Sequence, residues 1–215
     1  MAELSYPAKT AYQSEGAAET YDRIRFDSFK GKLADKREKE IIGKFLKVLP
    51  EGSLVLDLAC GTGRITEFLL SKGYKVCGVD ISKEMLKVAR ERVGSSGKLV
   101  NFYQAEAESL PFEGRIFDSA TCIKLFGHIP PETRIKILQE LKRVTKGPFV
   151  VAYYIAGPMA NAKRKIRKFL TGNKAPWFSV TKNSLRKEID LANLKILKEK
   201  LVLPFVSETL ILLLG

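Results

Sequence analysis

Two aspartates and a turn of small residues are the side chains whose spacing first indicates a ligand site. Asp57 ends an apolar run, a turn from Ala59 to Gly63 follows, and Asp80 ends the next apolar run 23 positions after Asp57. Glycines let a backbone approach a ligand closely, and the helix expected after the turn offers unpaired N–H groups. An acid about 20 residues beyond such glycines suits ribose hydroxyls. The spacing therefore predicts a nucleoside site at the carboxyl edge of two adjacent parallel strands.

The residues of the turn discriminate between nucleoside ligands. Counted from Gly61, a dinucleotide-binding GxGxxG pattern finds Gly63 but meets Thr66 where its third glycine belongs, and the phosphate-binding pattern GxxxxGK[ST] is absent. Asp57 would repel a pyrophosphate and attract a cationic ligand. S-adenosylmethionine carries an ammonium, a sulfonium and a ribose, so the charges favour it over NAD.

Strand-like and helix-like runs alternate through most of the chain. Strands are expected at 55–59, 75–80, 99–104, 117–123 and 148–154. Several are apolar at successive positions, which is typical of strands buried on both faces. Helical periodicity fills the intervals, and Ser82 is a candidate N-cap. Strand and helix in repeated alternation predict parallel strands joined by crossover helices.

The two ends of the chain depart from this alternation. Residues 17–30 and 33–49 are expected to form helices before the first strand, and 181–192 a late helix. The runs LKILKEKLVLP and SETLILLLG then follow with a gap too short for a crossover helix. They are predicted to form an antiparallel hairpin at the edge of the sheet.

Composition restricts the class of protein. A chain of 215 residues with 45% hydrophobic and 28% charged residues is typical of a soluble globular protein, not of a disordered or disulfide-rich one. The net charge of +13 raises the question of an anionic partner, and residues 158–215 carry 12 basic against 4 acidic residues. Cys60, Cys77 and Cys122 show no CxxC spacing, so buried thiols, no metal site and a cytoplasmic location are expected. No stretch is long and apolar enough to cross a membrane.

An ordered set of motifs resembles class I S-adenosylmethionine-dependent methyltransferases. The matching segments are DLACGTG, VCGVDISKEMLKVAR, QAEAESLPF (104–112), FDSATCIKLFGHI (117–129) and LKRVTKGPFVVAYY. The resemblance covers residues 17–156 and is nearest to the small-molecule subgroup of ubiquinone/menaquinone-biosynthesis methyltransferases. It implies an α/β, Rossmann-like, seven-stranded and mostly parallel sheet with an antiparallel C-terminal hairpin and helices on both faces.

The resemblance also implies how the chain is organised and what it does. One methyltransferase domain, 1–215, would consist of N-terminal helices (1–50), a cofactor-binding core (51–156), a substrate lid with the last helix (157–192) and a terminal hairpin (193–215). The implied reaction moves a methyl group from S-adenosylmethionine to an unidentified small-molecule acceptor and leaves S-adenosylhomocysteine.

The family's cofactor contacts carry over onto matching positions of this sequence. These positions are Tyr21, Asp57, Ala59, Gly61, Gly63, Asp80, Ile81, Glu106, Ala107, Lys124 and Leu125. Asp80 would hold the ribose, and Lys124 and Leu125 would flank the sulfonium. Glu106 stands where the family usually has Asp, one methylene shorter. Tyr21 and Arg25 lie one helical turn apart and would close over the site from a helix before the first strand.

The sequence indicates the residues that would contact the methyl acceptor less specifically than those that would contact the cofactor. His128, the only histidine, follows the fourth strand and is the candidate general base. The alternative is a histidine that merely packs beside the cofactor, because methyl transfer can rely on proximity and desolvation. The candidate acceptor-pocket aromatics are Tyr153, Tyr154, Trp177 and Phe178, with core packing the explanation for at least one of them.

A basic run, KRKIRKF at 163–169, leaves other functions open. It could contact nucleic-acid phosphates or hold an anionic head group, although the solvated face of a helix is the favoured interpretation. The absence of NPPY or DPPY after the fourth strand argues against methylases of exocyclic base amines. Two alternatives to a small-molecule methyltransferase remain, namely an RNA methyltransferase using the basic C-terminal region and a non-catalytic S-adenosylmethionine-binding protein. The sequence does not indicate the oligomeric state.

Overall fold

The computed structural model describes residues 22, 26–94, 100–155, 178–204 and 208–215. Most of the helix expected at 17–30 lies outside these residues, as do Tyr21, Arg25, Trp177 and the basic run 163–169. The remaining candidates lie on described strands, helices and loops.

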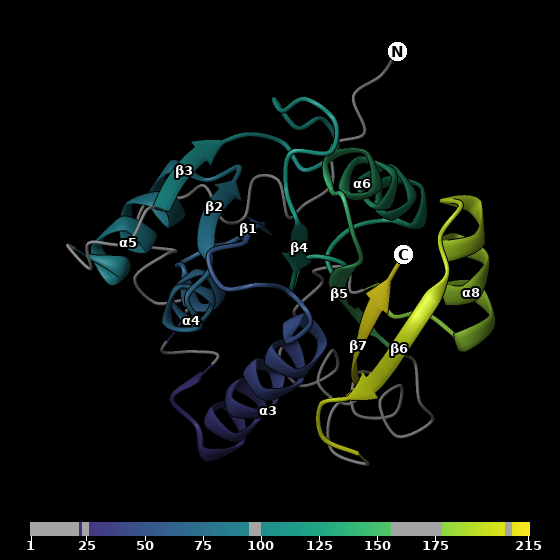
Figure 1. The fold of residues 1–215 in the computed structure, drawn as a ribbon. Coiled ribbons are helices and arrows are strands. Elements are labelled where there is room, and N and C mark those ends of the chain that lie inside the picture. Colours follow the sequence, from purple (N-terminus) through teal and green to yellow (C-terminus); the bar gives the residue numbers. More distant parts are fainter. Residues whose placement is uncertain (1–21, 23–25, 95–99, 156–177, 205–207) are drawn as a thin grey trace.

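The sheet has seven strands in the order β3-β2-β1-β4-β5-β7-β6 (Figure 1). In chain order they are β1 (Leu54–Leu58), β2 (Lys75–Asp80), β3 (Val100–Gln104), β4 (Ser119–Cys122), β5 (Phe149–Tyr154), β6 (Ile196–Leu201) and β7 (Thr209–Leu214). The first five pair in parallel, and β7 pairs antiparallel with both β5 and β6. The strand order reverses between β1 and β4, which is where open α/β sheets bind ligands.

The helices begin where the sequence supplies capping groups. They are α3 (Phe29–Leu46), α4 (Arg64–Ser71), α5 (Lys83–Val93), α6 (Pro131–Val144) and α8 (Lys182–Leu191). Ser28, Ser82 and Thr181 cap α3, α5 and α8, each accepting a backbone N–H three residues later at 3.0, 3.2 and 3.1 Å. Such caps satisfy one of the unpaired N–H groups of a first turn. Pro131 begins α6, where its missing N–H costs nothing.

Alternate strand positions build two cores, one on each face of the sheet. Val55 of β1 packs with Ile42 of α3 and Leu69 of α4, whereas Leu56 packs with Leu138 of α6 on the other face. In Figure 1, α3, α4 and α5 lie on one side of the sheet and α6 and α8 on the other. The sheet is therefore covered on both faces, as its apolar strands require.

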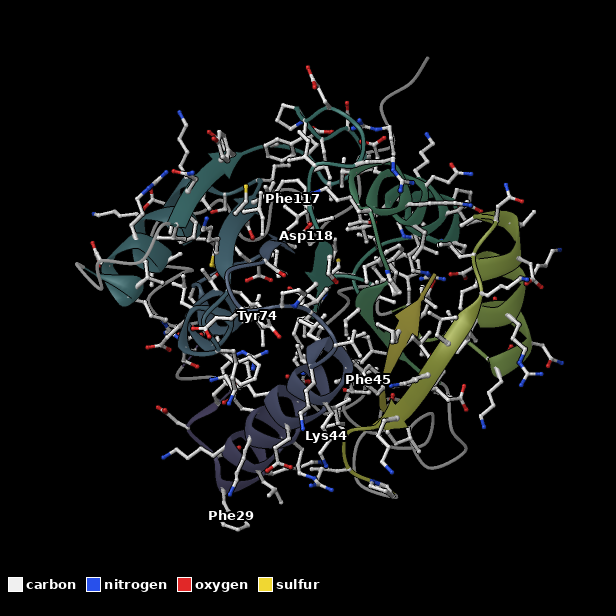
Figure 2. All side chains as sticks on the ribbon, in the orientation of Figure 1. Phe29, Lys44, Phe45, Tyr74, Phe117 and Asp118 are labelled. Atoms are coloured by element: carbon white, nitrogen blue, oxygen red, sulfur yellow. The ribbon has the colours of Figure 1, made fainter. Side chains whose placement is uncertain are left out.

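Helix α3 turns one stripe of side chains toward the sheet. Its buried residues are Glu38, Ile41, Ile42, Phe45 and Leu46. Figure 2 shows Phe45 on the side of α3 that faces β7, while Phe29 projects from the far end of the helix and is 84% exposed. One member of the buried stripe, Glu38, is a charged residue.

The predicted fold class is confirmed, including the terminal antiparallel hairpin. The helix expected at 33–49 spans Phe29–Leu46, because Ser28 provides its cap. The strand expected at 117–123 is shorter, since Phe117 forms only an isolated bridge with Thr145 before β4 begins. The proposed functional division of the chain at 51–156, 157–192 and 193–215 stays a prediction.

Candidate functional site

The turn between β1 and α4 is built from residues in the left-handed backbone region. Ala59, Gly61 and Gly63 have φ angles of 55°, 54° and 79°. A Cβ on Gly63 would lie 3.0 Å from the Cβ of Ala89, so glycine allows α5 to pack directly against the start of α4. A left-handed alanine is unusual and marks a backbone held by its surroundings. The turn is thus a fixed loop supported from behind by α5.

Asp80, the predicted ribose acid, is joined directly to this turn. The Gly61 N–H donates to Asp80 Oδ2 at 2.8 Å, and the Ser82 N–H donates to Oδ1 at 2.9 Å. Burial raises the pKa of Asp80 above its usual value, although these N–H groups favour the ionised form. The two predicted parts of a nucleoside site, the glycine turn and the acid that ends β2, therefore meet.

Asp57 lies beneath the turn with only 1% of its surface exposed. The hydroxyls of Thr66 and Thr121 donate to its two oxygens at 2.6 and 2.8 Å. Burial raises the pKa of Asp57 to about 6, and the two hydroxyl donors oppose that shift. A buried carboxylate held by neutral donors creates a negative potential that favours a cation near the turn.

The segment after β3 lies next to the end of β2. Gln104 Nε2 donates to the carbonyl of Ile81 at 3.0 Å, and the Ala105 N–H donates to the carbonyl of Asp80 at 3.1 Å. Ile81, Glu106 and Ala107 are partly exposed. The residues predicted to contact adenine are therefore brought to the same edge as Asp80.

On the other side of the turn, Lys124 leaves β4 with a left-handed φ of 68°. Its Nζ forms an ion pair with Glu38 of α3 and lies 6.0 Å from the ring centre of Tyr154 at the end of β5. Glu38 is fully buried and also pairs with Arg64 Nη2 at 3.0 Å. Arg64 is the first residue of α4, so one buried acid of α3 connects two loops of the site.

Sequence reasoning missed Glu38 and Arg64. The available signal was position, because Glu38, Ile41, Ile42 and Phe45 occupy one helical stripe, and a charge within an apolar stripe must be paired when it is buried. For Arg64 no comparable pattern exists, since it begins a short helix.

The segment before α3 also contacts the turn. Thr62 Oγ1 donates to Asp22 Oδ1 at 2.9 Å, and Arg92 of α5 forms an ion pair with Asp22. The Arg64 guanidinium pairs with Asp35 and lies 4.7 Å from the ring centre of Phe26. Tyr21 and Arg25 lie outside the described residues, so their closure over the site stays a prediction, while their neighbours Asp22 and Phe26 contact Thr62 and Arg64.

His128 lies in a loop after β4 that a second segment supports. The His128 N–H donates to the carbonyl of Leu125, and the Phe178 N–H donates to the carbonyl of Gly127, both at 2.9 Å. His128, Leu125 and Phe178 are each partly exposed. The structure thus brings Phe178 to the loop that carries His128, while Trp177 lies outside the described residues.

Tyr153 is a core residue, as the sequence predicted for at least one of the four candidate aromatics. It is 1% exposed, its hydroxyl donates to Glu188 at 3.1 Å, and its ring meets Phe126 edge-on at 4.9 Å. Glu188 accepts two bonds from Arg134, at 2.8 and 2.6 Å. Tyr153 therefore belongs to a buried polar network on the α6 and α8 face. Tyr154, the next residue, carries the ring that faces Lys124.

The three cysteines are buried free thiols, as predicted. Burial raises the pKa of Cys77 to about 12 and raises those of Cys60 and Cys122 as well, so all three stay neutral. In the described parts of the chain, no three His, Cys, Asp or Glu side chains gather where they could hold a metal ion. None of the described helices combines the length and apolar character needed to cross a bilayer. The cytoplasmic location stays a prediction.

Comparison with known sequences relates the site to a family. Residues 55–147 match the sequence profile of the family described as "Methyltransferase domain". Ubiquinone biosynthesis O-methyltransferase of Aromatoleum aromaticum is 34% identical over 94 residues, covering 43% of this chain and 40% of that protein. A tRNA (carboxymethyluridine(34)-5-O)-methyltransferase of Xenopus tropicalis is 32% identical over 134 residues, covering 62% of this chain and 20% of that protein. The chain thus spans well under two thirds of these relatives.

Comparison with solved structures extends the similarity to nearly the whole chain. Magnesium protoporphyrin IX methyltransferase from Synechocystis PCC 6803, crystallised with bound S-adenosylhomocysteine, matches with a TM-score of 0.78. The match covers 96% of this chain and 97% of that one at 19% identity, so it shows a shared fold. The predicted resemblance is confirmed in sequence over 55–147 and in fold over almost all of the chain.

Proposed function

We propose that the protein is an S-adenosylmethionine-dependent methyltransferase with a small-molecule acceptor, on the premise that its residues 55–147 match the methyltransferase-domain family. The observation that carries the proposal is the hydrogen bond from the Gly61 N–H to Asp80. It joins the backbone turn to the acid that suits a ribose, and Asp57 lies buried beneath the same turn.

The turn suits S-adenosylmethionine better than a pyrophosphate ligand. Because the pKa of Asp57 is about 6, its carboxyl is mostly ionised at neutral pH, which attracts an ammonium and repels phosphate. Among the described residues, nothing lies within 4 Å of the place that a Cβ would take on Gly61. The backbone of the turn is therefore open to close approach by a ligand.

Each cofactor-binding residue has a role under this proposal. Asp80 accepts the ribose hydroxyls, because each of its oxygens has a lone pair beyond the bond already accepted. Ile81 packs on adenine, with Glu106 and the Ala107 N–H at the ring edge. The residues that surround the methionine portion are Asp57, Ala59, Gly61, Gly63, Lys124 and Leu125, and Tyr21 covers the site.

The contribution of the protein to the reaction is alignment and exclusion of water. When bound, S-adenosylmethionine supplies an electrophilic methyl group on its sulfonium. The loop that carries His128 is held by hydrogen bonds to the Leu125 and Gly127 carbonyls, which supports its assignment to the acceptor side. For an acceptor that must lose a proton, His128 is the candidate base.

The acceptor is proposed to be small and apolar, with quinone-like compounds as the first class to test. Tyr154 and Phe178 are the described aromatic candidates for its pocket, and Trp177 would join them. Similarity to a ubiquinone-biosynthesis methyltransferase and to a porphyrin methyltransferase supports a small acceptor. Three free thiols are consistent with the cytoplasmic location predicted from the sequence.

A transfer assay with S-adenosylmethionine labelled in its methyl group tests the proposal. Phenols, quinols and total RNA are offered together, and the label is followed into the small-molecule and RNA fractions. We expect label in the small-molecule fraction. Label in RNA alone would instead support the RNA methyltransferase alternative. The similarity to a tRNA methyltransferase is the reason to include RNA in the assay. A protein that binds S-adenosylmethionine but transfers no label would support the non-catalytic alternative.

A further inference from the structure

Arg134 and Glu188 form a buried ion pair that also reaches a loop of the site. Arg134 lies near the start of α6 and Glu188 lies in α8, and Figure 1 shows these helices next to each other on one face of the sheet. The guanidinium donates from Nε and Nη2 to the two oxygens of Glu188 at 2.8 and 2.6 Å. Its third nitrogen, Nη1, donates to the carbonyls of Ile129 at 2.8 Å and Phe126 at 3.4 Å. One side chain therefore joins α8 to the loop between β4 and α6.

The backbone is held on both sides of His128. Ile129 follows His128 directly and is fully buried, and its carbonyl accepts the bond from Arg134. Gly127 precedes His128, and its carbonyl accepts the Phe178 N–H at 2.9 Å. The residues before and after His128 are thus each held by a residue from another part of the chain. Arg134 supplies one of these two supports.

Stability alone does not require a guanidinium at this position. A buried ion pair often contributes no more to the free energy of unfolding than an apolar pair of similar volume. An apolar pair, however, has no hydrogen-bond donor for the carbonyls of Phe126 and Ile129. Holding the loop by its carbonyls is therefore a role that a donor such as Arg134 can perform and an apolar side chain cannot.

We propose that Arg134, oriented by Glu188, is a positioning residue for methyl transfer that sets the place of the loop carrying His128. The inference rests on the proposed function, because that proposal assigns this loop to the acceptor side. Arg134 controls the rate of transfer and not the affinity for S-adenosylmethionine, since Asp57 and Asp80 are held by bonds of their own. Misplacement of a reacting group by about 1 Å can cost about 100-fold in rate.

The only histidine of the chain gives a direct reporter of the loop. Protein labelled with ¹³C in the histidine ring shows one set of ring C–H signals by NMR, and their positions and widths report the surroundings of His128 without any ligand. Calorimetry with S-adenosylmethionine and transfer of labelled methyl groups to phenols and quinols are then measured on the same proteins.

Two changes at the ion pair separate positioning from stability. Arg134→Lys keeps a cation for Glu188 but loses the fixed fork of donors that also reaches the two carbonyls. The double variant Arg134→Met/Glu188→Leu replaces the ion pair by an apolar pair, which should restore much of the stability lost in Arg134→Met. It does not restore a donor for the loop.

Arg143→Lys is the matched control on the same helix. Arg143 also pairs with an acid, Glu140, at 2.7 Å. Like Arg134 it donates to two carbonyls of a loop, those of Phe112 at 2.7 Å and Leu110 at 3.1 Å. The same chemical change is therefore made at a similar set of bonds to a different loop.

We expect Arg134→Lys and the double variant to displace or broaden the His128 signals. Both should lower the rate of transfer at saturating S-adenosylmethionine by about tenfold or more, with an affinity for S-adenosylmethionine within about twofold of the wild-type value. Arg143→Lys should leave the signals and the rate unchanged.

The outcomes separate this inference from the proposed function. His128 signals in Arg134→Lys that superimpose on those of the wild type, or normal transfer by the double variant, would show that the ion pair serves stability alone. Failure of the wild-type protein to bind S-adenosylmethionine would instead reject the proposed function, while the His128 signals would still show whether Arg134 holds the loop. Should Arg134→Lys not fold, the double variant decides the inference by the same measurements.

Discussion

The two faces of the sheet each contain a buried acid held by basic side chains, yet the two clusters differ in position. On the α3 and α4 face, Glu38 holds Arg64 and Lys124, which belong to the start of a helix and to a loop at the site. On the α6 and α8 face, Glu188 holds Arg134 and accepts the Tyr153 hydroxyl. All three members of the second cluster lie within regular elements.

Exposure separates the roles of the two clusters. The side chains of Arg134 and Glu188 are 2% and 4% exposed, whereas Lys124 is 17% exposed. Arg134 Nη1 also donates to the carbonyl of Ile129 at 2.8 Å, which anchors the loop that carries His128. One cluster thus fixes a loop from within the core, and the other pairs charges at the edge of the sheet that carries the candidate site.

The largest effect is expected from breaking the α6 and α8 cluster. Arg134→Met leaves Glu188 buried without its guanidinium partner and should cost about 3–5 kcal/mol of unfolding free energy. Urea unfolding measures this loss. The double variant Arg134→Met/Glu188→Leu should recover much of it, because an apolar pair of similar size can replace a buried ion pair. A single variant as stable as the wild type would contradict the structural role of the cluster.

The next effect concerns Asp57 and depends on pH. Its pKa is raised by burial to about 6 in the folded protein, so its ionised form opposes folding above pH 6, and this cost disappears as pH falls from 6 toward 4. Asp57→Asn should therefore stabilise the ligand-free protein by up to about 3 kcal/mol at pH 8, and the gain should shrink toward pH 4. Unfolding of both proteins by urea across this range measures the difference.

Asp118→Asn is the matched control, and its effect on the free energy of unfolding should have the opposite sign. Hydrogen bonds from the Lys146 side chain and the Leu54 N–H lower the pKa of Asp118. That group stabilises the fold above its unfolded pKa, so its removal should destabilise the protein at pH 8, and the loss should disappear in acid. Identical pH profiles for the two variants would refute the assignment of burial as the cause at Asp57.

A smaller effect tests how tightly α5 supports the glycine turn. Gly63→Ala should cost about 2–3 kcal/mol, because it combines a left-handed φ with a Cβ only 3.0 Å from that of Ala89. Gly52 has the same φ of 79°, but among the described residues nothing lies within 4 Å of its Cβ position. Gly52→Ala should thus show the backbone cost alone, about 1–2 kcal/mol. Thermal unfolding compares them, and equal losses would show that packing against α5 contributes nothing.

The part of the site nearest the sheet was predictable from the sequence. Asp57, the glycines and Asp80 occupy strand ends and a turn, and a parallel sheet brings such positions to one edge. The terminal hairpin followed from a gap too short for a crossover helix. Each of these features depends on a short stretch of sequence, so the pattern of residues within that stretch is enough to predict it.

The charged clusters were not predictable in the same way. Glu38 meets Lys124 across 86 residues and Arg134 meets Glu188 across 54, so no local pattern names the partners. Position on the helix predicts that Arg134 is buried, because it shares a buried stripe with Ile137, but it does not predict which residue pairs with it. Which of the candidate aromatics is a core residue could not be predicted for a related reason. In β5 every residue is buried, so alternation cannot tell which side chains face a pocket.

Titration with S-adenosylmethionine and, separately, with NAD tests the central claim most directly. The wild-type protein should bind S-adenosylmethionine with micromolar affinity and NAD far more weakly. Asp80→Asn should lose most of that affinity. Asp118→Asn makes the same change at the opposite edge of the sheet, where the parallel strands begin, and should keep it. A folded protein that binds NAD instead, or whose binding of S-adenosylmethionine is unaffected by Asp80→Asn, would contradict the account.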